Sequence, residues 1–285
     1  MAETVYILGA GASHSAGVPL MANFLATARS LLDGGKIGDA ASRFELVFEA
    51  IAELQKVHSK CVVDIRNVES VFAAFETAGI LERLGDLPTE RIKELPNAMK
   101  TLITKTVELT LRLRDTPHGV LPPQDYAELI KLIGLCADRP RPRSSPIPLA
   151  IITFNYDMGL DYALYKSGVP LSYGLDNAPG TPLLKLHGSL NWARCEVCGP
   201  TPWVLSDFFT DFDWRPRSQS LGSATLTIGS RLGDFQHHGK PVAPEPVIVP
   251  PTWNKLQYHQ ALSPVWRRAA KELSEARNIF VIGYS

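Results

Sequence analysis

The fold class is decided by the stretch Val5-Tyr-Ile-Leu-Gly9-Ala-Gly11-Ala-Ser13-His-Ser-Ala-Gly17. A β-branched and apolar run stops at Gly9, and an alanine-rich helical pattern follows over residues 22–32, which predicts a strand, a glycine turn and a helix. Glycines in such a turn let backbone N–H groups approach a pyrophosphate, and the N-terminus of the helix supplies partial positive charge. The stretch therefore favours a dinucleotide site, and a glycine turn that binds nothing is the alternative.

Four further short apolar runs are typical of strands buried in a parallel sheet. They occupy residues 149–153, 183–186, 247–249 and 279–282. Helical patterns near residues 157–166 and 258–276 separate some of these runs. Alternating strands and helices joined by right-handed crossovers predict an α/β fold with a doubly wound, mostly parallel, Rossmann-like sheet, which binds ligands at the carboxyl ends of its strands.

A proline-rich stretch, residues 139–148, marks the clearest boundary in the chain, because it cannot continue a helix. Together with the apolar residues at helical spacing before it, this linker belongs to a helical insert over residues 41–148. The Rossmann-like domain is then expected to comprise residues 1–40 and 149–285. Within it, an irregular excursion over residues 191–245 forms a small lobe.

The balance of basic and acidic residues gives no support to a polyanionic partner. Lys plus Arg number 29 and Asp plus Glu number 29 in 285 residues, so no excess of positive charge argues for nucleic acid or an anionic membrane. The chain has neither a secretory leader pattern nor an apolar run long enough to span a bilayer, which predicts a cytoplasmic protein. The apolar helix faces of the insert could pack against each other, against a second copy of the chain or against a partner protein, and the sequence favours none of these.

Polar side chains follow two of the expected strands. Asn155 and Asp157 come directly after residues 149–153, and His187 follows residues 183–186. An imidazole suits proton transfer near neutral pH, and an amide with a carboxylate can orient a substrate. The alternatives are structural: Asp157 can cap the next helix, Asn155 can complete a turn, and His187 can be a hydrogen-bonded core histidine.

Taken together, the glycine turn, Thr153-Phe-Asn-Tyr-Asp157 and His187-Gly-Ser189 resemble the SIR2 (sirtuin-related) family, in order and in position after strands. Gly17-Val-Pro19 is similar to the family's Gly-Ile-Pro, and Gly283-Tyr-Ser285 to its Gly-Thr-Ser. The resemblance implies that NAD is the substrate. It also implies the residues that bind NAD, namely Gly9, Ala10, Gly11, Ser13, Gly17, Asn155, Asp157, Gly283 and Ser285.

The resemblance further implies the catalytic roles. Asn155 would contact the ribose next to the bond that is broken, Asp157 would lie by the nicotinamide, and His187 would be the general base. These roles fit the chemistry, because cleavage at the anomeric carbon develops oxocarbenium character that an ordered nucleophile and a nearby carboxylate can stabilise. In the family, further segments follow the last strand and close over the adenine and ribose, so we expect some cofactor contacts from outside residues 1–285.

Two departures decide between activities of the family. Leu20-Met-Ala22 stands where sirtuin deacylases carry Asp-Phe-Arg. Tyr156, the large helical insert and Leu190-Asn-Trp192 are similar to prokaryotic SIR2-like NAD hydrolases of antiviral defence. The resemblance therefore implies an NAD hydrolase that releases nicotinamide and ADP-ribose. An NAD-dependent protein deacylase and a non-catalytic NAD or ADP-ribose sensor are the alternatives.

The four cysteines do not form a complete metal-binding pattern. Cys195-x-x-Cys198 stands where sirtuins carry the first half of a four-cysteine zinc module, but no further cysteine follows it. Only His237 and His238 could complete a tetrahedral set, and adjacent histidines point in different directions on most backbones. We therefore expect no metal ligands and no bound zinc, but a pair of reduced cysteines. The other two, Cys61 and Cys136, are expected in the core.

Overall fold

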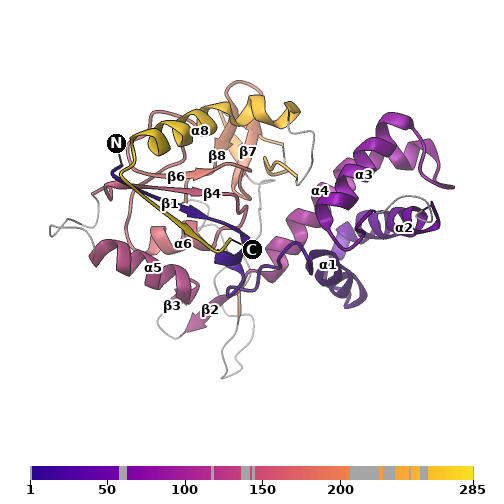
Figure 1. Ribbon diagram of the computed structural model, residues 1–285, viewed down its shortest axis with the longest axis horizontal. Coiled ribbons are helices and arrows are strands. Elements are labelled where there is room, and N and C mark those ends of the chain that lie inside the picture. Colours follow the sequence, from indigo (N-terminus) through magenta and orange to yellow (C-terminus); the bar gives the residue numbers. More distant parts are fainter. Residues whose placement is uncertain are drawn as a thin grey trace. The chain divides into compact units, whose positions relative to one another are not determined.

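The computed structural model of the chain, shown in Figure 1, divides into two compact units. The first unit comprises Met1–Val18, Glu108–Ile248 and Tyr258–Ser285, and the second comprises Pro19–Val107 and Val249–Gln257. The structure describes residues 2–57, 63–116, 119–135, 142, 145–205, 225–226, 235–243, 245–250 and 256–284. Cys61 and Cys136, expected in the core, and Ser285, expected at the NAD site, lie outside these residues.

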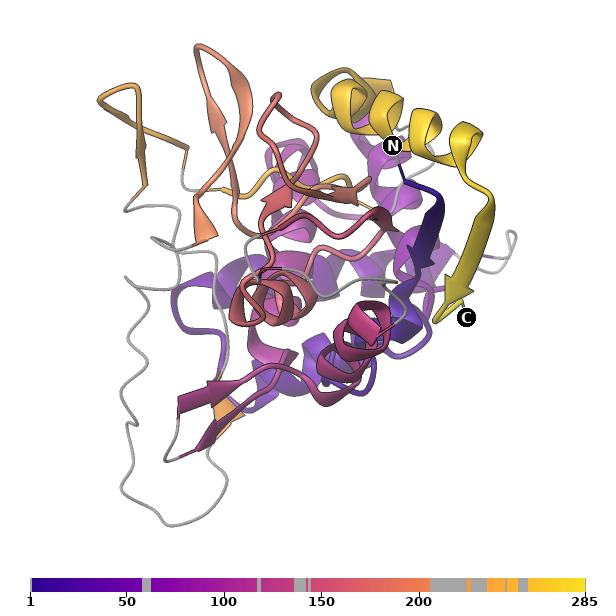
Figure 2. The same ribbon diagram turned by 90° about the vertical axis from the view of Figure 1, so that its left-hand side faces the viewer.

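A five-stranded sheet forms the centre of the first unit, and all its strands are parallel (Figures 1 and 2). The strand order is β12-β1-β4-β6-β5. The strands are β1 (Thr4–Leu8), β4 (Leu149–Thr153), β5 (Leu171–Ser172), β6 (Thr181–Lys185) and β12 (Asn278–Ile282). The α/β class and the mostly parallel sheet expected from the sequence are therefore confirmed.

Register brings the carboxyl ends of four strands to one level. Leu8 at the end of β1 is paired with Thr153 of β4 on one side and with Ile282 of β12 on the other. Thr153 is in turn paired with Lys185, the last residue of β6. Residues that follow these four strands therefore emerge at the same edge of the sheet.

Helices lie on both faces of this sheet, as Figures 1 and 2 show, although the edge strand β12 stays largely exposed. Helix α8 (Leu256–Glu275) lies over one face, whereas α5 (Gln124–Leu135) and α6 (Gly159–Lys166) lie over the other. All five side chains of β4 are buried between these layers, which explains why its sequence is a continuous apolar run. The helices expected near residues 157–166 and 258–276 are therefore present.

One expected strand is wrong. Residues 247–249 do not join the parallel sheet, and Ile248 forms only an isolated antiparallel bridge with Gly188. The backbone of Val247 instead accepts a hydrogen bond from the N–H of Ser189 and donates one to the carbonyl of Trp192. A short buried apolar run has the same sequence pattern whether it lies in a sheet or packs beside a loop, because periodicity cannot separate the two.

The segment expected to be an irregular excursion contains two small antiparallel hairpins. They pair β7 (Trp192–Cys195) with β8 (Gly199–Pro202), and β10 (Gln236–His237) with β11 (Lys240–Pro241). A further antiparallel sheet joins β2 (Leu113–Thr116), β3 (Gly119–Leu121) and β9 (Thr225–Leu226). Strands of two to four residues carry too few alternating positions to be recognised from sequence.

The second unit is helical. It contains α1 (Phe24–Asp33), a 3₁₀ turn at Gly38–Ala40, α2 (Ala41–Val57), α3 (Val68–Leu81) and most of α4 (Thr89–Thr110). Its core consists of large apolar side chains that are fully buried, among them Phe44, Phe72, Phe75, Ile92, Leu95, Met99 and Leu102. Across the part of the chain that the structure describes, no helix is both long enough and apolar enough to span a bilayer.

Candidate functional site

The glycine turn packs directly against the end of the last strand. After β1 the chain forms a short 3₁₀ helix, η1 (Ala10–Ser13), and the residues before and within it reach β12 through the backbone. The N–H of Gly9 donates to the carbonyl of Ile282 at 2.9 Å, and the N–H of Gly11 donates to the carbonyl of Gly283 at 2.8 Å. These two donors are therefore used within the protein, and a phosphate would have to meet other groups of the turn.

Close backbone approach explains why glycines occupy these positions. A Cβ atom added to Gly9 would lie 2.7 Å from the carbonyl oxygen of Gly283, and one added to Gly11 would lie 2.8 Å from the same oxygen. Gly283 itself has a φ of +68°, in the left-handed region that favours glycine. Gly17, also expected to bind NAD, has a φ of +99°, and a Cβ atom added there would collide with the backbone carbonyl of Thr110.

We expect Gly11→Ala to lower the free energy of unfolding by about 1–3 kcal/mol, because the new methyl group forces the turn away from Gly283. Thermal unfolding of the purified variant would measure the loss. Gly134→Ala is the matched control, since a Cβ at this exposed helical position meets nothing within 4 Å. That variant should be as stable as the parent or slightly more stable. Equal stability of Gly11→Ala and the parent would contradict the close packing described above.

Ser13 is the centre of a buried hydrogen-bond network. Its hydroxyl accepts from the Nδ2 of Asn155 at 2.9 Å and donates to the Oδ2 of Asp157 at 2.6 Å. The hydroxyl of Tyr126 lies 2.8 Å away. A serine hydroxyl has one hydrogen, so Tyr126 must donate to Ser13, and every hydrogen-bonding position of Ser13 is then used. Burial is the main cause that raises the pKa of Tyr126, which keeps this phenol protonated as the donor.

Asn155 is fixed in one orientation by the glycine turn. Its Nδ2 also donates to the carbonyl of Gly9 at 2.9 Å, so both amide hydrogens point back toward the turn. Its backbone N–H donates to the Oγ1 of Thr153, whose hydroxyl donates to the carbonyl of Leu8. The side-chain oxygen of Asn155 therefore faces away from the turn in a fixed direction.

Asp157 is buried and bonded at both of its carboxylate oxygens. Oδ2 accepts from Ser13, and Oδ1 accepts at 2.9 Å from the backbone N–H of Gly159, the first residue of α6. Burial is the main cause that raises the pKa of this carboxyl, while Lys185 and the hydrogen bond from Ser13 act in the opposite direction. The N-cap residue of α6 is Met158, so Asp157 is not the cap itself, but its side chain joins the first residue of the helix to the glycine turn.

A buried ion pair lies behind Asp157, and sequence reasoning missed it. The Nζ of Lys185 donates to Asp161 at 2.9 Å and to the backbone carbonyls of Asp157 at 2.6 Å and Tyr156 at 3.4 Å. The other carboxylate oxygen of Asp161 accepts from the hydroxyl of Tyr173. Lys185 is only 1% exposed. A lysine within the apolar run 183–186 was the available signal, because lysines are almost never fully buried unless paired.

His187 lies beside aromatic rings at the same edge of the sheet. Its ring centroid is 5.1 Å from that of Phe154, edge to face, and 6.1 Å from that of Tyr156, nearly parallel. These two rings flank Asn155 in the sequence. His187 is half-buried.

The loop that carries His187 is held in place by the residues after it. Gly188 has a φ of +83°, and a side chain there would collide with the backbone carbonyl of Val247. The hydroxyl of Ser189 contacts the carbonyl of Tyr156 at 3.4 Å, and the N–H of Leu190 donates to the same carbonyl. The loops after β4 and β6 are therefore joined at Tyr156, which fixes Asn155 and His187 relative to each other.

The structure thus brings together Gly9, Gly11 and Gly283 in one backbone contact, and Ser13, Asn155 and Asp157 in one network. Ala10 begins η1 between them. Tyr126 is a further member that the sequence did not indicate, because it lies in a helix that was expected to belong to the insert. No protein-family model matches the chain, and no curated protein matches it either.

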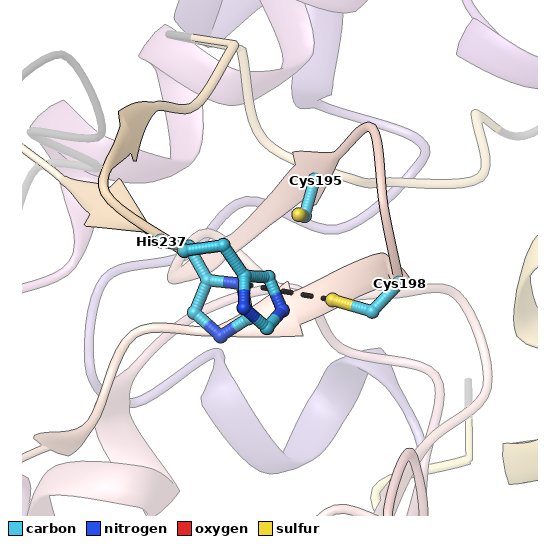
Figure 3. A group of neighbouring side chains, drawn as sticks. Cys195, Cys198 and His237 are labelled. Carbon is cyan, nitrogen blue, oxygen red and sulfur yellow. Dashed lines mark hydrogen bonds between the residues drawn. The ribbon is translucent and has the colours of Figure 1, made fainter.

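A second cluster of side chains lies in the two hairpins, outside this network. Cys195 and Cys198 come from the β7–β8 hairpin, and His237 and His238 from the β10–β11 hairpin. One potential ligand atom from each of the four lies within 4.8 Å of every other. Figure 3 shows Cys198 directed at His237, with their Sγ and Nδ1 atoms 3.6 Å apart. Hydrogen bonding to His237 is the main cause that lowers the pKa of the Cys195 thiol to about 6.

Proposed function

We propose that the first unit binds NAD at the edge where β1, β4 and β12 end, and cleaves its nicotinamide–ribose bond to give nicotinamide and ADP-ribose. The observation that carries this proposal is the fixed carboxamide of Asn155, held by Gly9 and Ser13 at the carboxyl ends of parallel strands. Ligands of doubly wound sheets bind at this edge. That the ligand is NAD is what the resemblance to SIR2-like enzymes implies.

In this proposal each residue has one task. The side-chain oxygen of Asn155 orients a ribose hydroxyl or the attacking water, which lowers the entropic cost of reaching the transition state. His187 accepts the proton of that water as its oxygen bonds to the anomeric carbon and the bond to nicotinamide breaks. Asp157 is a positioning residue, because both its oxygens are bonded within the protein and it holds Ser13 and thereby Asn155.

We expect NAD to raise the unfolding temperature of the purified protein. A ligand that binds only the folded state at about a hundred times its Kd adds about 2.7 kcal/mol to the free energy of unfolding. Thermal unfolding in a series of NAD concentrations measures the effect, and ADP-ribose should act similarly because it keeps both phosphates. Nicotinamide alone, which lacks the phosphates, is the control. An unchanged unfolding temperature at millimolar NAD would count against the site.

Binding without cleavage is the second candidate function, and one observation favours it. The hydrogens of Asn155, the hydroxyl of Ser13 and the carboxylate of Asp157 are all used within the protein, as in a rigid recognition site. An NAD or ADP-ribose sensor would need no proton acceptor, however, and the role of His187 would then be structural, through contacts such as those with Phe154 and Tyr156. Nicotinamide release from NAD separates the two candidates.

Other consequences of the resemblance stay predictions. These are action on cytoplasmic NAD, a part in prokaryotic antiviral defence, and assembly with further copies or a partner protein. The alternative of a protein deacylase is tested in the same reaction by adding an acetyl-lysine peptide. A deacylase would release nicotinamide only when the peptide is present, whereas the proposed hydrolase releases it from NAD and water alone.

A further inference from the structure

We propose that Cys195, Cys198, His237 and His238 bind one zinc ion in a tetrahedral site that joins the β7–β8 hairpin to the β10–β11 hairpin. Zinc–sulfur bonds of about 2.3 Å and zinc–nitrogen bonds of about 2.0 Å place tetrahedral ligand atoms roughly 3.3–3.8 Å apart. The 3.6 Å between Cys198 Sγ and His237 Nδ1 falls in that range. The whole set lies within 4.8 Å, so small side-chain movements close the site.

The backbone of the first hairpin is arranged to stabilise a thiolate. The N–H of Val197 donates to the Sγ of Cys195 at 3.4 Å, from the turn between β7 and β8. Such a donor offsets the negative charge of a sulfur ligand and fixes its direction, as partners of metal ligands generally do. The hydroxyl of Thr201 lies 3.1 Å from the Sγ of Cys198 and fixes the second sulfur.

The second hairpin shows why two adjacent histidines reach the same point. His237 pairs with Lys240, which leaves His238 and Gly239 as the two turn residues, with φ of +52° and +71°. Two positive φ values in a two-residue turn favour Asn-Gly or Gly-Gly, and histidine is an unusual choice there. The left-handed backbone at His238 brings the two imidazole centroids to 4.2 Å from each other. This geometry removes the sequence-based objection that neighbouring histidines point apart.

A metal ion also accounts for the existence of so small a hairpin. Strands β10 and β11 have two residues each, and an isolated hairpin of that size has little stability of its own. Next to it in the sequence, Phe235 stacks on Trp203 with ring centroids 5.1 Å apart. Four protein ligands leave no open coordination position, so this zinc is structural and independent of NAD cleavage.

Metal analysis of protein purified without chelators tests the proposal, and about one zinc per chain is expected. Exchange of zinc for Co²⁺ should give the strong visible absorption of a tetrahedral site together with a sulfur-to-cobalt band. Chelation should lower the unfolding temperature, and added Zn²⁺ should restore it. Protein that holds no zinc and gives no cobalt spectrum on addition of Co²⁺, or that contains a Cys195–Cys198 disulfide, would overturn the proposal.

Variants then test each ligand. Cys195→Ser and His237→Ala should each weaken Co²⁺ affinity by about a hundredfold or more. Removing a residue that only hydrogen-bonds to a metal ligand already costs about ten- to a hundredfold, and removing the ligand itself should cost more. His238→Gly is the sharpest variant, because it should weaken metal binding while relieving strain in the metal-free turn. Glu196→Gln and Lys240→Gln, exposed in the same two hairpins, should bind as the parent does. Unchanged affinity in His238→Gly would overturn the four-ligand set.

Discussion

Replacing either His187 or Asn155 by alanine is expected to lower NAD cleavage by about a hundredfold or more. His187→Ala removes the proton acceptor, and Asn155→Ala removes the oxygen that orients ribose or water. The rate of nicotinamide release at saturating NAD measures both effects. Because the proposed roles are realised mainly in the transition state, the affinity for NAD should fall much less than the rate.

The folded state of these variants needs its own measurement, since Asn155 also joins the glycine turn to Ser13. Unfolding temperature and circular dichroism identify any variant that loses activity only by losing structure. Asn177→Ala is the matched control, because Asn177 is an exposed amide on the same unit. Parental cleavage rates in folded His187→Ala and Asn155→Ala proteins would contradict the mechanism. Binding of NAD without cleavage by the parent protein would favour the sensor.

The second large effect is expected at the buried ion pair. Lys185→Met leaves the carboxylate of Asp161 in the interior without its cation, and it removes the donor to the carbonyls of Asp157 and Tyr156. Loss of one partner of a buried pair costs about 3–5 kcal/mol in the free energy of unfolding. Urea titration of the variant and the parent measures this difference.

Two further variants show whether the loss of stability comes from an unpaired buried charge or only from removal of a long side chain. In Lys185→Met combined with Asp161→Asn, the uncompensated charge at Asp161 is gone, and part of the lost stability should return. The return should be incomplete, because the buried carboxyl of Asp157 still lacks the nearby cation. Arg29→Met removes the cation of an exposed pair with Asp33, and it should cost less than about 1 kcal/mol. If Lys185→Met lost no more stability than Arg29→Met, the ion pair would not contribute in the way proposed.

Local signals were sufficient for much of the fold and for part of the site. The apolar runs that became β4 and β6 are followed by polar residues, the run that became β1 is followed by the glycine turn, and parallel strands align their carboxyl ends. This is why Asn155 and Asp157 could be expected near the glycine turn. The resemblance gave them roles in NAD cleavage, and those roles stay predictions.

Other features depend on contacts that no local pattern contains. Tyr126 meets Ser13 because α5 packs beside α6, and nothing in the sequence around Tyr126 indicates a partner so far along the chain. The convergence of His237 and His238 depends on a left-handed turn conformation that is most often signalled by asparagine or glycine. The segment 247–249 was wrongly expected to be a strand of the parallel sheet. Its residues are apolar because they are buried, although the segment forms only an isolated bridge.

The contact between the glycine turn and β12 also determines when the parallel sheet can be completed during folding. β1 is synthesised long before β12, yet Thr4 is paired with Asn278, and Gly9 and Gly11 donate to Ile282 and Gly283. Such long-range pairing gives a high contact order, and loop-closure entropy must be overcome before these contacts form. A nascent chain released before β12 has been made would hold an unfinished sheet with an exposed strand edge, which invites aggregation or chaperone binding.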